Sequence, residues 1–435
     1  MDVTVSSVAA IRGSIRVPGD KSIAHRALIL GAMAEGEQIV TGLPDSADVA
    51  STVACLRALG CTIEKQPDDS VRISGGLRIS GEDIKAAGSP AGEIALDAGN
   101  SGTTARLLAG TIAGLGLDCL IDGDVSLRSR PMARIAEPLG LMGAEIRTSV
   151  GGCLPMRIRG GGLKAVTFRL PVASAQVKSC VLLAGLNASD STTVIEKTLT
   201  RDHTEILLQA MGVPVDRKTG AVTVPGGVRP RAITVNVPGD ISSAAFFAAA
   251  AALLPGSEVR LAGTGVNPTR TGALEVMQRM GASITFENCA TRSGEPVADI
   301  VVRSGSLCGV DIDGPMIPAL IDELPLLAVL ATQAEGAFTV SGAEELRHKE
   351  SDRIAAIVSN LSRLGARIEE HSDGFTVHGP APLQGTRVRS FGDHRIAMAM
   401  AVAGLVASDE TIIDDAGAVA VSYPHFFQDM DALTA

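Results

Sequence analysis

The residues best suited to chemistry are cations that stand where helices are expected to begin. Lys21 and Arg26 follow Asp20, a residue type that often caps a helix, and an apolar run then continues to Met33. The amino end of a helix carries partial positive charge, so a cation there is disfavoured unless an anion also binds. The pattern predicts a site for a phosphate or carboxylate group at the start of this helix.

The same stretch has a near-copy that lacks the lysine. Residues 17–20 read Val-Pro-Gly-Asp, and these four residues recur at 237–240 ahead of a second apolar helix. Pro-Gly favours the centre of a type II turn, because proline fixes φ and glycine accepts a positive φ. The copy predicts that the turn and the cap are structural, whereas Lys21 needs a further explanation.

Polar and charged residues also stand at the expected starts of other apolar helices. They are the turn at 100–104, which includes Gly102, with Arg106; Ser174, Gln176 and Lys178; Asp322; and Asp393, His394 and Arg395. Arg128 and Arg130 come shortly after the second of these helices, and Lys349, Glu350 and Arg353 lie between the last two starts. Each alone has an ordinary explanation as a cap, a turn or a solvated ion pair. Together they predict a trap for two or more phosphate or carboxylate groups, with Asp322, Glu350 and Lys21 as acid–base candidates.

Composition excludes several classes of partner. The 435 residues carry a formal net charge of −10 and only 2% of them are aromatic, which argues against nucleic acid as a partner. The seven cysteines are scattered without a Cys-x-x-Cys pair, which indicates a reducing compartment and no disulfide framework. Metal-binding and dinucleotide-binding motifs are missing, so we expect no metal and no cofactor. The apolar runs are too short to cross a bilayer, and we expect a cytoplasmic protein without membrane contact.

Internal repeats predict the architecture. A phrase in which a helix ends at glycine and a strand follows recurs at Gly60, Gly143, Gly212, Gly281 and Gly365. A second series of helices, apolar on nearly every face, begins near Asp20, Asn100, Ser174, Asp240, Asp322 and Asp393. The two series predict six repeats, each with one buried helix, one amphipathic helix and several strands.

The two Val-Pro-Gly-Asp copies divide the repeats into two groups of about three. We expect an N-terminal domain over residues 20–238 and a C-terminal domain over residues 239–435, which residues 1–19 join by strand pairing. The chemistry is then expected in a cleft between the two domains.

The motifs jointly resemble one family, the 5-enolpyruvylshikimate-3-phosphate (EPSP) synthases, also named 3-phosphoshikimate 1-carboxyvinyltransferases. The segments that carry the resemblance span the chain and are 19–26, 100–106, 130–131, 174–176, 201–205, 267–270, 322, 349–353 and 393–395. The resemblance implies an α/β (α+β) fold, namely a two-domain inside-out α/β barrel of six βαβαββ repeats, three per domain. The family fold closes over its substrates like a clamp.

The resemblance also implies a reaction. Members transfer the enolpyruvyl group of phosphoenolpyruvate to the 5-hydroxyl of shikimate 3-phosphate and release phosphate, through a tetrahedral intermediate. This is a step of the shikimate pathway to aromatic amino acids. Lys21 resembles the family residue that touches both substrates, Asp322 would accept the hydroxyl proton, and Glu350, with Lys21, would handle the proton at the methylene carbon.

Family contacts with the two substrates carry over residue by residue. For shikimate 3-phosphate they fall on Lys21, Ser22, Arg26, Ser174, Ala175, Gln176, Arg201, Asp322 and Lys349, and for phosphoenolpyruvate on Lys21, Gly102, Arg130, Gln176, Arg353 and Arg395. Two substrates with several negative charges require several cations, and arginine suits phosphate and carboxylate. The resemblance further implies a monomer that glyphosate inhibits and that needs no cofactor.

Two positions depart from the family pattern. Val421 stands where many members carry a lysine that contacts phosphoenolpyruvate. The segments 174–178, 201–205 and 267–270 resemble the glyphosate-tolerant class, yet Gly102 stands where tolerant members place alanine. Sensitivity to glyphosate therefore stays open, as does whether His394 acts in catalysis or only positions Arg395.

Two rival interpretations remain at this point. The sister enzyme that transfers enolpyruvyl to UDP-N-acetylglucosamine resembles the same fold, but it uses a cysteine where this chain has Val125. A non-catalytic ring of repeats around a polymer would need a basic inner surface and would not need Asp322 and Glu350 beside the cations. Release of phosphate from phosphoenolpyruvate with each acceptor separates the three.

Overall fold

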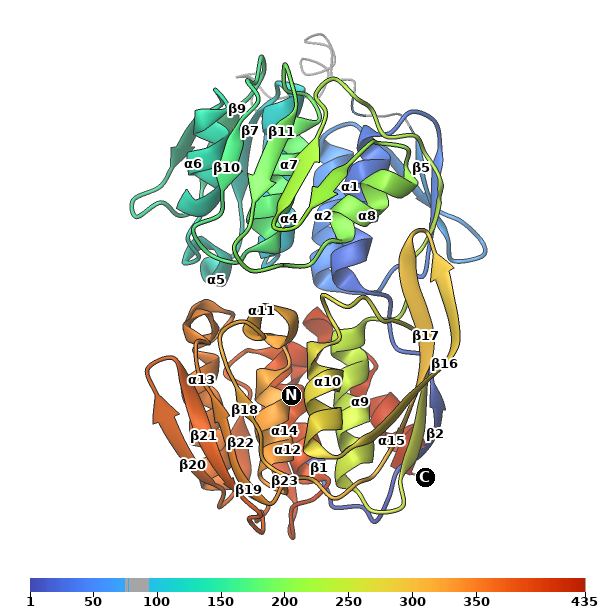
Figure 1. The fold of residues 1–435 in the computed structure, drawn as a ribbon, viewed down its shortest axis with the longest axis vertical. Helices are drawn as coiled ribbons and strands as arrows, with labels where there is room; N and C mark the ends of the chain where they lie inside the picture. The colour runs from blue at the N-terminus through green and yellow to red at the C-terminus, as the bar shows by residue number, and fades with distance from the viewer. Residues whose placement is uncertain (75–76, 78–93, 435) are drawn as a thin grey trace. The chain divides into compact units, whose positions relative to one another are not determined.

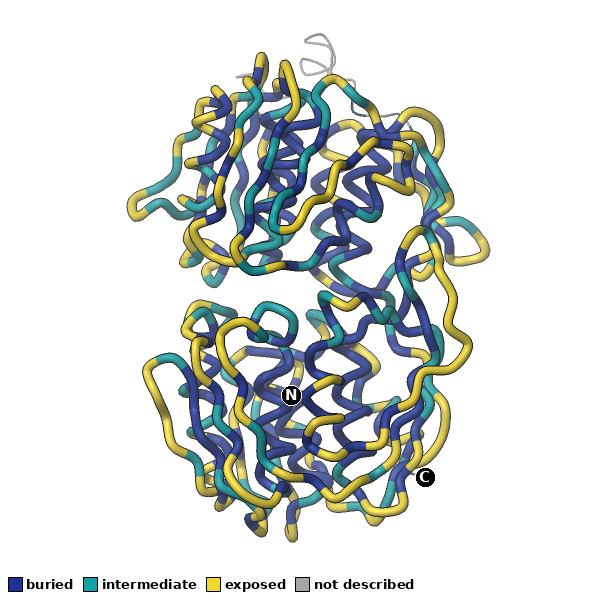
Figure 2. The backbone as a smooth tube through the Cα atoms, in the orientation of Figure 1, coloured by how far each residue is buried: buried dark blue, intermediate teal, exposed yellow. Residues whose placement is uncertain are grey.

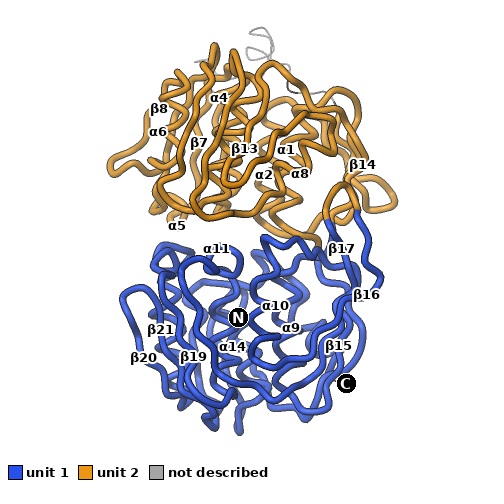
Figure 3. The backbone as a smooth tube through the Cα atoms, in the orientation of Figure 1, with its two compact units in different colours: residues 1–18, 238–291, 296–435 blue, residues 19–237, 292–295 orange. Residues whose placement is uncertain are grey.

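The computed structural model describes residues 1–74, 77 and 94–434, and the chain falls into two compact units. Unit 1 contains Met1–Pro18, Pro238–Thr291 and Pro296–Ala435, and unit 2 contains Gly19–Val237 and Arg292–Glu295 (Figure 3). Unit 2 is therefore one continuous segment together with the tip of a hairpin. Unit 1 is assembled from segments on both sides of that insertion.

The described strands form six sheets, five of four strands and one of three. Each sheet contains one parallel pair, and the inner strand of that pair has an antiparallel partner on its other side. A parallel pair requires a crossover connection, which helices provide here (Figure 1). The mixed α/β class and the sixfold repetition predicted from the sequence are confirmed, with six separate sheets rather than one closed barrel.

Unit 2 holds three of these sheets. In spatial order their strands are β14 (Thr234–Asn236), β3 (Gln38–Thr41), β5 (Val71–Ser74) and β4 (Thr62–Lys65); β6 (Ile94–Asp97), β7 (Asp118–Asp122), β9 (Met156–Arg159) and β8 (Glu145–Thr148); and β10 (Thr167–Arg169), β11 (Thr192–Ile195), β13 (Ala221–Val224) and β12 (Asp216–Lys218). Its described helices are α1 (Lys21–Met33), α2 (Ala47–Ala58), α4 (Gly102–Leu115), α5 (Val125–Arg128), α6 (Ala133–Leu141), α7 (Ala175–Gly185) and α8 (His203–Ala210).

Unit 1 holds the other three. Their strands are β16 (Ser283–Arg292), β17 (Glu295–Arg303), β15 (Glu258–Gly265) and β2 (Arg12–Ile15); β18 (Asp311–Ile312), β19 (Gly336–Val340), β21 (Gly374–Gly379) and β20 (Arg367–His371); and β1 (Val3–Val5), β23 (Thr411–Asp414) and β22 (Arg387–Arg389). Its helices are α9 (Ile241–Leu253), α10 (Gly272–Met280), α11 (Ile317–Leu320), α12 (Leu324–Ala331), α13 (Arg353–Arg363), α14 (His394–Gly404) and α15 (Phe426–Thr434), with 3-10 turns η1 (Glu344–His348) and η2 (Ala416–Val421).

One helix of each repeat lies in the core. These helices are α1, α4 and α7 in unit 2 and α9, α12 and α14 in unit 1, and most of their residues are buried (Figure 2). Their nearly uniform apolar composition suits burial on all sides. Each unit has its own hydrophobic core around its three helices. The prediction of one buried helix per repeat is confirmed.

The local signals at helix ends are confirmed in large part. The glycines of the repeated phrase, Gly60, Gly143, Gly212, Gly281 and Gly365, all have a positive φ, which side chains disfavour. Asp20 caps α1 by accepting from the Ile23 N–H at 2.9 Å, and Asp240 caps α9 in the same way at Ser242. Two predicted starts are shifted, since Ser101 rather than Asn100 caps α4, and Glu323 rather than Asp322 precedes α12.

The predicted type II turn is wrong. Neither Gly19 nor Gly239 has a positive φ, so the turn that needs it is not formed. Gly19 is required for a different reason, because a Cβ there would lie 1.8 Å from the Gly42 carbonyl oxygen. Gly239 instead donates its N–H to the Gly263 carbonyl at 2.9 Å. Close approach of two backbone segments, and not a left-handed turn, explains the glycine at position 19, whereas a Cβ at Gly239 would meet the Val17 side chain at 3.0 Å.

Candidate active site

The carboxylates and cations predicted from the second half of the chain meet at three helix starts of unit 1. Asp322 lies just before α12, and Lys349 and Glu350 lie between η1 and α13. Arg353 is the first residue of α13, and Arg395 is the second residue of α14. Since the repeats place these helix starts side by side, residues up to 73 positions apart become hydrogen-bonded neighbours.

Arg353 is the hub of this cluster. Its Nε donates to Asp393 Oδ2 at 2.8 Å, its Nη1 to Asp322 Oδ1 at 3.2 Å and its Nη2 to Glu350 Oε2 at 2.7 Å. Its side chain is 1% exposed. Burial opposes the charge on Arg353, but the surrounding carboxylates Asp393, Glu350 and Asp322 outweigh it and raise the pKa of the guanidinium. The two carboxylates predicted to move protons are therefore held on adjacent nitrogens of one permanent cation.

Asp322 also faces the other two cations of the cluster. Lys349 Nζ lies 3.5 Å from its Oδ1, and Arg395 Nη2 lies 3.7 Å from its Oδ2. The side chain of Asp322 is 13% exposed, so it keeps access to solvent while three cations surround it. Such neighbours favour the ionised carboxylate, the form that can accept a proton.

A buried acid, Glu323, accepts a hydrogen bond from the guanidinium group of Arg395. Glu323 Oε1 lies 3.4 Å from Arg395 Nη1 and also accepts from the Ser242 hydroxyl, which in turn accepts from Arg270 Nη2 at 2.6 Å. Glu323 is 2% exposed and Arg270 is 3% exposed. Sequence reasoning missed Glu323, although its position between Asp322 and a buried helix start was a usable signal.

In unit 2, Lys21 is the first residue of α1 and forms an ion pair. Its Nζ lies 2.7 Å from Asp48 Oδ2 at the start of α2. The side chains are 22% and 11% exposed. Asp48 was not predicted. It lies in the first turn of α2, and no sequence pattern near it indicates an ion pair with Lys21, 27 positions earlier. The ion pair with Asp48 therefore fixes the position of the Lys21 ammonium group, and the Lys21 side chain remains accessible to solvent.

A second group of predicted residues gathers at the starts of α4 and α7. Arg106 Nη1 donates to Gln176 Oε1 at 2.6 Å, and Arg130 Nη2 donates to Asn100 Oδ1 at 2.8 Å. A Cβ at Gly102 would lie 3.0 Å from Arg106 Nη1 and 3.5 Å from Arg130 Nη1. The amide partners carry no charge, so these bonds orient the arginines without cancelling their charge. The first turn of α4 thus presents backbone N–H groups between two guanidinium groups, a favourable setting for an anion.

Arg26 has a supporting position rather than an exposed one. It is 3% exposed, and its three guanidinium nitrogens donate to Thr204 Oγ1, the Ser22 carbonyl and Ser179 Oγ at 2.7 to 2.8 Å. Burial lowers the pKa of Arg26 to about 10, Glu205 opposes that shift, and Arg201 adds to it. The nearby Ser174 caps α7, where its Oγ accepts from the Val177 N–H at 3.4 Å, and Ala175 is the first residue of that helix.

A chain of hydroxyl groups links α1, α2 and α4 beneath Lys21. His25 Nδ1 lies 2.7 Å from Thr52 Oγ1, which lies 2.7 Å from Thr104 Oγ1. Thr104 Oγ1 in turn donates to Ser101 Oγ at 2.7 Å. Burial lowers the pKa of His25 to about 3, so the ring is neutral at physiological pH. His25 is a buried core residue that is satisfied only at Nδ1, since its Nε2 has no hydrogen-bond partner among the described residues.

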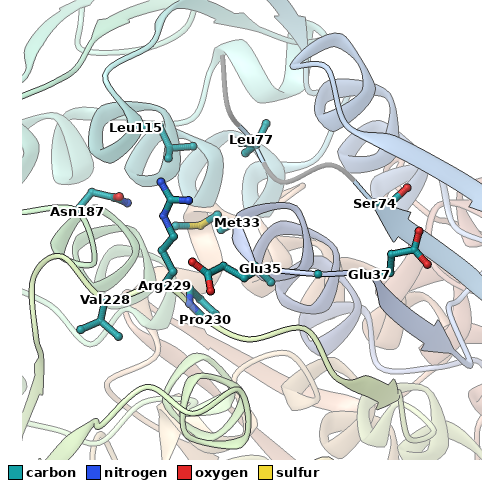
Figure 4. A pocket seen from close by; sticks show the side chains of 12 residues that line it. Met33, Glu35, Glu37, Ser74, Leu77, Leu115, Asn187, Val228, Arg229 and Pro230 are labelled. Atoms are coloured by element: carbon teal, nitrogen blue, oxygen red, sulfur yellow. The ribbon is translucent and has the colours of Figure 1, made fainter. Parts of the chain in front are cut away.

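A hollow elsewhere in unit 2 does not contain the predicted residues. Its volume is about 710 Å³, and its lining includes Met33, Glu35, Leu115 and Arg229 (Figure 4). Met33 ends α1, so the hollow lies about 18 Å from Lys21 at a rise of about 1.5 Å per residue. Over residues 1–74, 77 and 94–434, the side chains form no cluster of three or more potential metal ligands. No helix in that part of the chain has the length and apolar character to cross a membrane.

Comparisons with known proteins identify the family of this chain. Residues 5–430 match the family model described as EPSP synthase (3-phosphoshikimate 1-carboxyvinyltransferase). A 3-phosphoshikimate 1-carboxyvinyltransferase of Bacillus thuringiensis (strain Al Hakam) is 45% identical over 427 residues, which cover 98% of this chain and 97% of the relative. One from Synechococcus sp. (strain JA-3-3Ab) is 49% identical over 436 residues, or 99% and 96% of the two chains.

A solved structure extends the likeness to three dimensions. EPSP synthase from Acinetobacter baumannii superposes with a TM-score of 0.86 at 40% identity, covering 99% of this chain and 98% of that one. The match is full-length in sequence and in fold, and it confirms the resemblance drawn from the motifs. This chain belongs to the EPSP synthase family, the 3-phosphoshikimate 1-carboxyvinyltransferases.

Proposed function

We propose that the clusters of the two units act on the same pair of substrates and carry out the reaction of this family. The enzyme transfers the enolpyruvyl group of phosphoenolpyruvate to the 5-hydroxyl of shikimate 3-phosphate and releases phosphate, in the shikimate pathway of aromatic amino acid biosynthesis. The observation that carries the proposal is Arg353, which holds the carboxylates of Asp322 and Glu350 on adjacent nitrogens.

Three proton transfers define the chemistry. In the addition step, Asp322 accepts the proton of the 5-hydroxyl as that oxygen bonds to C2 of phosphoenolpyruvate, and C3 receives a proton. In the elimination step, C3 loses a proton and the C2–O bond to phosphate breaks, which restores the double bond. Glu350, together with Lys21, donates the proton to C3 in the addition step and removes a proton from C3 in the elimination step. The base for the hydroxyl and the acid–base group for the carbon are thus separate groups, a division that suits an addition followed by an elimination.

We divide the predicted binding residues between the two substrates. For phosphoenolpyruvate we assign Lys21, Gly102, Arg130, Gln176, Arg353 and Arg395, and for shikimate 3-phosphate Lys21, Ser22, Arg26, Ser174, Ala175, Gln176, Arg201, Asp322 and Lys349. The guanidinium group of Arg395, held by Glu323 Oε1, supports the assignment of that residue, because a preformed donor binds an anion with little reorganisation. Val421 supplies no charge, so binding of phosphoenolpyruvate relies on Lys21 and the assigned arginines.

The deciding experiment measures phosphate released from phosphoenolpyruvate with two acceptors. We expect release with shikimate 3-phosphate and formation of the enolpyruvyl ether, identified by its mass. UDP-N-acetylglucosamine should give no release. Release with UDP-N-acetylglucosamine alone would assign the sister reaction, and no release with either acceptor would reject an enolpyruvyl transferase.

Three further properties belong to the same proposal. Glyphosate is expected to compete with phosphoenolpyruvate, because both present anionic groups to the arginines near Gly102. The enzyme is expected to act as a cytoplasmic monomer, and its seven cysteines are all free, as suits a reducing compartment. Sedimentation at micromolar concentration tests the monomer, and inhibition at varied phosphoenolpyruvate concentration tests the competition.

A further inference from the structure

The segment that carries Arg201 is held by a buried ion pair. It connects β11 to α8 and therefore has no sheet or helix of its own to fix it. Lys178, on α7, lies with its Nζ 3.0 Å from Glu196 Oε1 and 2.7 Å from Glu205 Oε1. The side chains of Lys178 and Glu205 are each 1% exposed and that of Glu196 is 4% exposed. Charges buried this deeply destabilise a fold unless they are paired, so their retention points to a specific task.

Lys178 and Glu196 both bind Thr200, the residue before Arg201. Glu196 Oε2 accepts from the Thr200 backbone N–H at 3.1 Å and from its hydroxyl at 2.8 Å. Lys178 Nζ donates to the Thr200 carbonyl at 3.3 Å. Both backbone polar groups of Thr200 are therefore bound by the two partners of one ion pair. This arrangement, the Thr200 clamp, consists of Lys178, Glu196 and Thr200.

The clamp lies beside residues already assigned to shikimate 3-phosphate. Lys178 is on the same helix as Ser179, which accepts from Arg26 at 2.8 Å. Glu205 follows Thr204, which accepts from Arg26 at 2.7 Å, and its charge also acts on Arg26. The segment from Thr200 to Glu205 is thus tied to α1 and α7 through side chains buried in unit 2. A shift of Thr200 would move Arg201 directly.

We infer that the Thr200 clamp positions Arg201 for shikimate 3-phosphate, and that Lys178, Glu196 and Thr200 are positioning residues for that substrate alone. The inference rests on the proposed function, since it assigns these residues to one of its two substrates. A site group must be held to within a fraction of an ångström to bind its ligand well, and a connecting segment cannot hold it without such support. Loosening the clamp therefore weakens binding of shikimate 3-phosphate and leaves phosphoenolpyruvate unaffected.

The test compares Thr200→Val with Thr200→Ser in the full-length enzyme. Valine has the shape of threonine but cannot donate to Glu196, whereas serine keeps the hydroxyl. We expect Thr200→Val to raise KM for shikimate 3-phosphate by about five- to tenfold, with KM for phosphoenolpyruvate within twofold of wild type. Thr200→Ser should restore the wild-type value. Titration calorimetry with shikimate 3-phosphate alone should show the same loss of affinity.

Thr193→Val is the matched control. Thr193 lies on β11 of the same unit and shares a hydroxyl hydrogen bond of 2.8 Å with Thr223, away from Arg201. Thr193→Val removes one hydroxyl hydrogen bond between neutral groups, so it should lower Tm by no more than Thr200→Val does, and only Thr200→Val should change KM. Glu196→Gln tests the clamp from the acceptor side and should reproduce the KM split.

Three results separate the possible failures. An unchanged KM for shikimate 3-phosphate in Thr200→Val, or an equal rise for both substrates, would overturn the clamp while leaving the proposed function intact. A rise of the same size in Thr193→Val would show a general effect of lost stability and would also overturn it. A wild-type enzyme that neither binds nor converts shikimate 3-phosphate would reject the proposed function, and the inference with it, before any variant is measured.

Discussion

Lys21 and Asp48 form an ion pair of 2.7 Å between the first turns of α1 and α2. The side chains are 22% and 11% exposed, so the pair is mostly buried and fixes where the ammonium group points. We expect Lys21→Met to weaken binding of each substrate at least about tenfold, as the loss of one charge-assisted bond to each predicts. Tm should change little.

The control is Lys65→Met, because Lys65 also forms an ion pair in unit 2, with Asp69 at 2.8 Å, but its side chain is 71% exposed. It should leave KM and Tm unchanged. A large fall in Tm for Lys21→Met with intact binding would return Lys21 to a structural role.

Asp322→Asn separates proton transfer from binding. Asparagine keeps the shape and an oxygen for Arg353 Nη1 at 3.2 Å, but it cannot take the hydroxyl proton. We expect kcat to fall by about a hundredfold or more, the usual size of a general-base effect, while the Kd of shikimate 3-phosphate changes only a few-fold. Asp373→Asn serves as the control, because Asp373 is a partly exposed carboxylate that accepts from the Gly342 N–H. Near-normal turnover in Asp322→Asn would remove this residue from catalysis.

Gly102→Ala places a methyl group at the first turn of α4. Its Cβ would lie 3.0 Å from Arg106 Nη1, and the flexible end of that arginine must move by a few tenths of an ångström. We expect the fold to tolerate the change, with Tm within a few degrees, because alanine suits a helix better than glycine. KM for phosphoenolpyruvate should rise, and the inhibition constant of glyphosate should rise by a larger factor. Equal factors would mean that the methyl group does not discriminate between the two ligands.

His25 makes stability depend on pH. Burial lowers the pKa of His25 to about 3, whereas the unfolded chain takes up this proton near pH 6.5. The stabilisation is complete above pH 6.5 and is lost as the pH falls toward 3, at about 1.4 kcal/mol per pH unit. Denaturant titrations at pH 6.5 and pH 5 should therefore show a loss of about 2 kcal/mol from this group.

His25→Gln should flatten that part of the pH profile, because glutamine does not titrate. The exposed His425 gives the control variant His425→Gln, which should keep the wild-type slope. An unchanged slope in His25→Gln would place the acid sensitivity elsewhere in the chain.

Local sequence signals predicted local structure well. Asp20 and the five glycines of the repeated phrase act within one turn of their own position, so residue type and spacing suffice to identify them. The same is true of the buried helices, whose apolar composition leaves no polar face. Motifs therefore located the amino ends of helices, and with them most residues of the candidate site.

The neighbours to which these residues bond or against which they pack could not be predicted in the same way. Arg26 donates to Thr204, 178 positions later in the chain, and only the packing of α1 against α8 brings them together. Gly19 was assigned to a turn because its true constraint, the Gly42 carbonyl, is not a neighbour in sequence. Asp322 was predicted as an acid–base residue, but its three cationic neighbours, Arg353, Lys349 and Arg395, could not be read from the sequence.

The placement of unit 2 inside the sequence of unit 1 has a consequence for synthesis on the ribosome. β2 pairs with β15 in the register Arg12 to Glu258, and β1 pairs with β23 in the register Val3 to Ile413. More than half of the chain must leave the exit tunnel before β2 meets its partner, and nearly all of it before β1 does. Unit 2, by contrast, has all but its four hairpin-tip residues as soon as Val237 is made. The nascent protein therefore carries two unpaired strands through most of its translation, and such strands are places where chaperones bind and aggregation begins.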